Sequence, residues 1–109
     1  MANIDNILKD AEKQIAELAE KLFKQFTKQA IADGKDFLNE ARDDLERWVG
    51  ELERNEIDQS NFESLVRGQK DEAEMRALKQ AGLAQVKIDT FTNGVLDIVI
   101  NAAFAAIKI

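Results

Sequence analysis

The feature that most constrains this chain is the apolar run over residues 94–107, in which only Asp97 and Asn101 are strongly polar. On a helix, Asn93, Asp97 and Asn101 lie four residues apart and form one narrow polar stripe. The rest of the helix circumference is apolar. Such a helix must be covered by its own protein, by copies of itself or by lipid.

Two apolar seams flank the polar stripe, one through Phe91, Val95 and Ile98 and the other through Leu96, Ile100 and Ala103. We expect one seam to pack inside the protomer and the other to meet a neighbouring copy. The polar stripe then either fixes how copies meet or faces water. The residues predicted to form the oligomer interface, or alternatively a membrane-insertion element, are Phe91, Val95, Leu96, Ile98, Val99, Ile100, Ala103, Phe104 and Ile107.

Membrane insertion is the main alternative for residues 94–109. The apolar span of about 13 residues covers ~20 Å as a helix, whereas the hydrocarbon core of a bilayer is ~30 Å thick. Extending the span toward the N-terminus adds Asp89, and an Asp at the bilayer centre costs about 2.5–3.5 kcal/mol. A lone spanning helix is therefore disfavoured, but a pore lined by the polar stripe or a segment released at a lipid surface remains an alternative.

The composition predicts an all-α fold in one domain of 109 residues. The chain has no proline, only five glycines and no cysteine, and it is rich in strong helix formers. We expect an antiparallel helical bundle of three long helices, with a fourth if the chain breaks at Asn93-Gly94. A strand over 95–100 is disfavoured because no second β-like run precedes it and because the alanines that follow prefer helix.

The first two predicted helices span residues 1–33 and 36–56. In the first, apolar residues recur every three or four positions, and Asp33-Gly34 supplies a helix-ending signal. In the second, Asp36 is a candidate N-cap, and Trp48 continues a seam with Leu45 and Leu52. Trp48 is therefore predicted to be a core residue.

The third predicted helix spans residues 60–92 and begins at a capping box formed by Ser60 and Glu63. Its apolar spacing continues across Asn93-Gly94, which favours one long helix from about residue 71 to residue 108 over a break at Asn93-Gly94. Gly68 and Gly82 are weaker candidates for a break, because a single glycine in a helix costs only about 1 kcal/mol.

Charge and residue types exclude several functions. The chain carries 21 acids and 15 bases, and with a net charge of −6 it lacks an obvious basic face for nucleic acid. It has no His, Cys or Tyr, so the usual nucleophile–base pairs and zinc ligands are missing, and we expect no enzymatic activity, cofactor or metal. The acidic helix over residues 36–58 is predicted to be a solvated face or a docking surface for a basic protein.

The sequence therefore predicts a non-enzymatic structural or interaction protein that forms homo-oligomers through its apolar C-terminal helix. The alternative is a small membrane-active protein, either pore-forming or bound to a lipid surface, that uses residues 94–109. The first residues show no basic segment followed by an apolar core, so we expect a cytoplasmic protein, or a membrane-associated one under the alternative.

Overall fold

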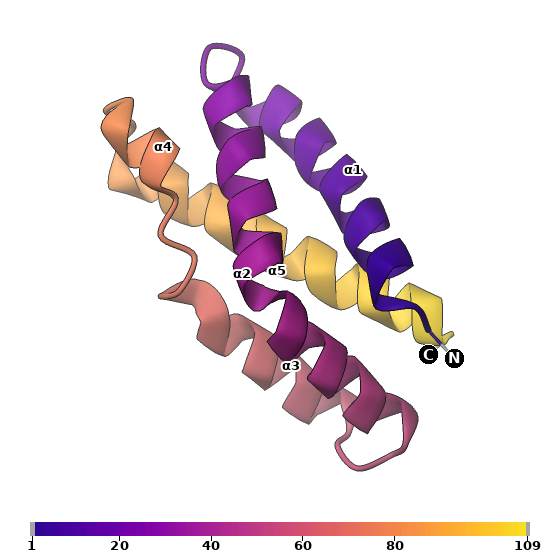
Figure 1. Ribbon diagram of the computed structural model, residues 1–109. Coiled ribbons are helices and arrows are strands. Elements are labelled where there is room, and N and C mark those ends of the chain that lie inside the picture. Colours follow the sequence, from indigo (N-terminus) through magenta and orange to yellow (C-terminus); the bar gives the residue numbers. More distant parts are fainter. Residues whose placement is uncertain (1, 109) are drawn as a thin grey trace.

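The computed structural model describes residues 2–108, and every regular element in that range is helical, which confirms the predicted all-α class (Figure 1). Five α-helices and one short 3-10 helix pack together. They are α1 (Ile4–Leu22), α2 (Thr27–Glu53), α3 (Gln59–Arg67), η1 (Gly68–Lys70), α4 (Arg76–Gln80) and α5 (Gln85–Ile107).

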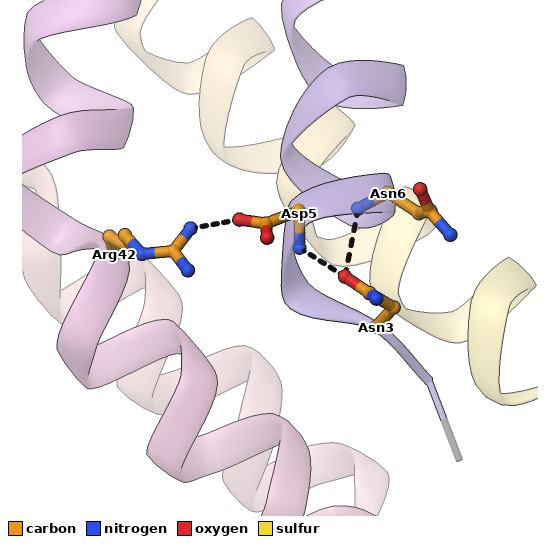
Figure 2. A network of polar contacts seen from close by, with 4 residues as sticks. All are labelled: Asn3, Asp5, Asn6 and Arg42. Atoms are coloured by element: carbon orange, nitrogen blue, oxygen red, sulfur yellow. Dashed lines mark hydrogen bonds and ion pairs between the residues drawn. The ribbon is translucent and has the colours of Figure 1, made fainter.

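The start of α1 is fixed by Asn3, which caps the helix (Figure 2). The side-chain oxygen of Asn3 accepts hydrogen bonds from the backbone N–H groups of Asp5 at 2.8 Å and Asn6 at 3.4 Å. Such a cap satisfies amide donors that have no partner within the helix. The carboxylate of Asp5 in turn faces the guanidinium of Arg42 on α2, so the same turn is also tied to the neighbouring helix.

The first predicted helix, 1–33, is too long at its C-terminal end, because α1 stops at Leu22. The chain leaves the helix at Phe23, whose backbone carbonyl accepts a hydrogen bond from the hydroxyl of Thr27 at the start of α2. Phe23 is buried and Phe26 is half-buried. The turn is therefore stabilised by burying two aromatic rings, and no glycine or proline marks it in the sequence.

The helix α2 runs straight through Asp33-Gly34, so this pair does not end a helix and Asp36 does not cap one. Gly34 is needed for packing. A Cβ at this position would lie 2.6 Å from Cγ2 of Ile15 on α1, so the missing side chain allows the two helices to approach closely. The second predicted helix, 36–56, therefore begins earlier and ends at Glu53.

Contacts between α1 and α2 show that the two helices run antiparallel. Lys35 pairs with Glu12 at 3.6 Å, and further along α2 the Glu53 carboxylate accepts a hydrogen bond from the backbone N–H of Ala2 at 2.8 Å. Residues later in α2 therefore contact residues earlier in α1, as in an antiparallel pair.

The third predicted helix, 60–92, is divided into α3, η1, α4 and the start of α5. Its predicted capping box is also misplaced, because Asp58 is the N-cap of α3 and forms the box with Asn61 instead of Ser60 with Glu63. The connection between α4 and α5 passes through Gly82 at a φ of +85°, a conformation that favours glycine. Gly82, one of the weaker break candidates, is thus a point where the helix is interrupted. At Gly68 the α-helix only changes into η1, and the first interruption follows at residues 71–75.

Asn93-Gly94 lies inside α5, so neither the predicted break at this pair nor the predicted continuous helix from residue 71 is correct. Gly94 is a second site of close approach, since a Cβ there would lie 2.6 Å from Cδ2 of Leu18 on α1. The absence of a side chain at Gly94 therefore allows α5 to pack closely against α1.

The core is organised around α5, which passes behind α2 in Figure 1 with α1 and α3 on either side. The Phe23 and Phe91 rings meet edge to face with centroids 5.6 Å apart, and Phe62 of α3 packs 5.7 Å from Phe104. Trp48 is 7% exposed, as predicted for a core residue.

Candidate interaction surfaces

Most of the predicted oligomer interface lies inside the protomer. The apolar flanks of α5 face α1 on one side and α3 on the other, so both seams contribute to the fold of a single chain. Ile98, Phe104 and Ile107 are half-buried and keep part of their surface accessible. The other six residues are buried, namely Phe91, Val95, Leu96, Val99, Ile100 and Ala103.

The polar stripe of α5 faces solvent along its whole length, with Asn93, Asp97 and Asn101 all exposed. Asp97 accepts a hydrogen bond from Arg67 of α3 at 2.7 Å, and both side chains are about half exposed. The sequence did not indicate Arg67 as the partner, because it lies 30 residues away and meets Asp97 only once α3 has folded against α5.

Replacing Asp97 by alanine should therefore change the free energy of unfolding by less than about 1 kcal/mol, since exposed ion pairs contribute little and alanine is the better helix former. Chemical denaturation followed by circular dichroism measures this change. Arg67→Ala is the matched control and should have a similarly small effect. A loss of more than about 2 kcal/mol for Asp97→Ala would mean that its carboxylate is buried.

Folding creates a basic surface from two segments that are distant in sequence, residues 21–28 and 76–87. Each segment contains three basic residues and no acidic residue. The contact between Phe23 and Phe91 joins the α1–α2 turn to the first turns of α5, and the two segments lie at the same end of the molecule in Figure 1. The basic side chains are Lys21, Lys24, Lys28, Arg76, Lys79 and Lys87.

Most basic side chains of this surface are not engaged in ion pairs. Arg76 pairs with Glu74, but the five lysines form no ion pair within residues 2–108. This surface is not apparent from the sequence, because each segment alone carries only three bases.

The basic surface also holds Leu22 and Val86, the two large apolar residues that are exposed in the described part of the chain. Leu22 is 39% exposed and Val86 is 77% exposed. Val86 lies in the first turn of α5 with its side chain facing solvent, and Lys87 follows it directly. Accessible apolar side chains beside free positive charges are typical of a contact surface.

An acidic surface lies at the opposite end of the molecule, which is 43 Å long (Figure 1). Residues 43–63, which span the end of α2, the following turn and the start of α3, contain eight acids and two bases. Both bases are paired locally, Arg47 with Asp44 and Arg54 with Glu56. The hydrogen bond from Arg54 lowers the pKa of the Glu56 carboxyl, which therefore keeps its charge to lower pH.

An apolar groove opens within the acidic surface, between the α2–α3 turn and the last turn of α5. Its apolar lining comes from Leu52, Ile57 and Ile107. Glu53 and Asp58 lie beside these residues, and both carry negative charge next to the apolar lining. We call this feature the end groove.

A second acidic cleft lies between α2 and residues 69–76, where Asp36, Glu40, Glu72 and Glu74 approach one another. Within the range that the structure describes, no group of three or more His, Cys, Asp or Glu residues has a metal-binding arrangement. The cleft therefore adds negative charge to this side of α2.

Comparison with known proteins identifies no relative. No family model, no curated protein and no solved structure matches the chain.

Proposed function

We propose that this chain is a non-enzymatic assembly protein that self-associates through its oppositely charged ends. The observation that supports the proposal is the separation of charge along the molecule. The two segments of the basic surface carry six bases, of which only Arg76 is paired in the part of the chain that the structure describes, and the acidic surface carries eight acids against two bases. Opposite charges at the two ends favour approaches in which unlike ends meet, because bringing two like ends together costs electrostatic repulsion.

In this proposal the copies meet through the first and last turns of α5, whereas the sequence predicted that they meet through its apolar flanks. The buried flanks hold the protomer together, while its first turn belongs to the basic surface and its last turn lines the end groove. The basic partner expected for the acidic helix 36–58 is then the basic surface of another copy. Under this proposal the protein works in the cytoplasm and needs no membrane.

Association through these surfaces should be weak and sensitive to salt. Exposed ion pairs contribute about 0.2–1 kcal/mol each, and at 0.1 M ionic strength charges more than about 10 Å apart are largely screened. The net charge of −6 adds a general repulsion between copies.

Light scattering on purified protein tests the proposal. At low ionic strength the weight-average mass should rise above 12.3 kDa with increasing concentration, and it should return to the monomer value at high salt. A mass of 12.3 kDa at every concentration at low salt would overturn the proposal. An increase in mass that high salt does not reverse would show association by another mechanism.

A membrane-active role is the second candidate function, and the properties of α5 favour it. With 23 residues, α5 is long and apolar enough to cross a membrane by length and composition, although part of its most apolar segment is buried in the protein. Inserting α5 requires separating it from α1 and α3. Flotation of the intact chain with liposomes containing anionic lipid tests this role, and recovery of all protein in the lipid-free fraction would contradict it.

A further inference from the structure

The two ends of the molecule differ in shape as well as charge, and this difference defines a specific contact. We infer that Val86 of one copy inserts into the end groove of the next copy, so that the protein assembles head to tail. This inference rests on the proposed self-association and adds the contact through which it occurs.

The inserting side is built around an exposed apolar residue. Val86 is 77% exposed, and its neighbours on α5, Gln85 and Lys87, are also exposed. Burying Val86 against apolar groups would remove its side chain from water, which favours association. Lys87, the next residue, is exposed on the same turn, so a surface that receives Val86 also lies near a positive charge. Asp89, one helical turn further along α5, accepts a hydrogen bond from Gln85 at 2.9 Å.

The receiving side meets both requirements. Ile57 and Ile107 are half-buried, and together with Leu52 they give the end groove an apolar lining that is accessible from solvent. Glu53 and Asp58 also line this groove and supply negative charge for Lys87 or for the other lysines of the basic surface. The groove therefore has an apolar centre with acidic neighbours, complementary to an apolar residue with basic neighbours.

The two carboxylates are held in place by contacts within the chain. Glu53 accepts a hydrogen bond from the backbone N–H of Ala2 at 2.8 Å, and Asp58 accepts one from the backbone N–H of Asn61 at 2.7 Å. These backbone donors fix the position of the carboxylates without neutralising their charge. The end groove is thus organised before a second copy arrives, which lowers the entropic cost of association.

The contact joins two different surfaces, so it is heterologous. After two copies join, one still has a free Val86 and the other a free end groove, and association continues into open chains or closed rings. A symmetric dimer, by contrast, would use the same patch on both copies and would stop at two.

Two single substitutions block the contact from opposite sides. Val86→Glu places a negative charge where the basic surface would meet the acidic one, and Ile57→Glu places a charge in the apolar lining of the end groove. Ile107→Glu is a second groove variant in case Ile57→Glu disturbs the α2–α3 turn. Asn93→Glu adds the same charge on the exposed stripe of α5, two helical turns from Val86 and outside the lining of the end groove, and serves as the control.

Light scattering or sedimentation at low ionic strength gives the readout, with circular dichroism confirming that each variant is folded. Val86→Glu and each groove variant alone should remain monomeric. The native chain and Asn93→Glu should form species of higher mass at the same concentrations. An equimolar mixture of Val86→Glu with a folded groove variant should give a species of twice the monomer mass and nothing larger, because one intact Val86 and one intact groove remain.

The outcomes separate this inference from the proposed function. If the native chain does not associate, the proposed function fails. If the native chain associates and Val86→Glu associates equally well, the protein assembles through another contact and this inference alone is wrong. A mixture of folded single variants that stays monomeric would likewise overturn the head-to-tail contact.

Discussion

Replacing Phe91 by alanine is expected to lower the free energy of unfolding by about 3–5 kcal/mol, the usual cost of deleting a buried phenylalanine side chain. Phe91 is fully buried and its ring packs against Phe23 at the α1–α2 turn. The substitution leaves a cavity between α5 and that turn. Domains of this size are stable by only about 5–15 kcal/mol, so the loss is a large share of the total.

Denaturation monitored through Trp48 fluorescence measures this loss, because Trp48 is buried and is the single tryptophan of the chain. Val86→Ala is the matched control on the same helix, and it should change stability by less than about 0.5 kcal/mol because Val86 is exposed. A loss below about 1 kcal/mol for Phe91→Ala would show that α5 is only loosely packed, as expected of an insertion element rather than a core helix.

Replacing Asp33 by alanine is expected to lower stability by about 2–4 kcal/mol, because two charge-assisted hydrogen bonds are lost and two amide donors lose their acceptor. Asp33 lies within α2, is 4% exposed, and accepts hydrogen bonds from the backbone N–H groups of Ala77 at 2.9 Å and Leu78 at 2.8 Å. These bonds attach the start of α4 to α2 and hold the fully buried Leu78 in the core.

Hydrogen exchange at Ala77 and Leu78 provides the local measurement, and both amides should exchange faster in Asp33→Ala. Asp36→Ala is the control, since Asp36 is exposed on the same helix and its side chain forms no hydrogen bond in the described part of the chain. If Asp33→Ala and Asp36→Ala lower stability by the same amount, the attachment of α4 does not depend on Asp33.

Asp33 and Gly34 show where sequence reasoning reaches its limit. In the sequence the pair reads as the end of a helix, because glycine accepts a left-handed backbone and aspartate is common near turns. In the fold both residues serve tertiary contacts, Asp33 with α4 and Gly34 with Ile15. Neither contact has a local signature, so the pattern could not distinguish a turn from a helix that needs a small residue and a buried acceptor.

Gly82 and Gly94 illustrate the same limit. Both glycines lie within an apolar spacing that keeps its phase from Leu78 onward, and a helix through either costs about 1 kcal/mol. The chain turns at Gly82, where φ is +85°, and continues as helix through Gly94, which packs against Leu18. Helical class and the apolar seams follow from periodicity, whereas the points at which the chain turns depend on packing between helices.

The surfaces were predictable to different degrees. The acidic surface is visible in the sequence because its charges are contiguous, and the exposed polar stripe follows from helical spacing. The basic surface needs the contact between Phe23 and Phe91 to bring residues 21–28 and 76–87 to one end. The use of both α5 seams within the protomer also depends on α3 packing beside it, which no local pattern specifies.

Small-angle X-ray scattering across a concentration series at low salt tests the central claim most directly, namely that copies join end to end while α5 stays in the core. The monomer measures 43 × 22 × 19 Å. We predict that with rising concentration the particles lengthen along the 43 Å axis while their cross-section stays that of the monomer. Growth in the cross-section would instead show side-by-side association, and it would contradict the account.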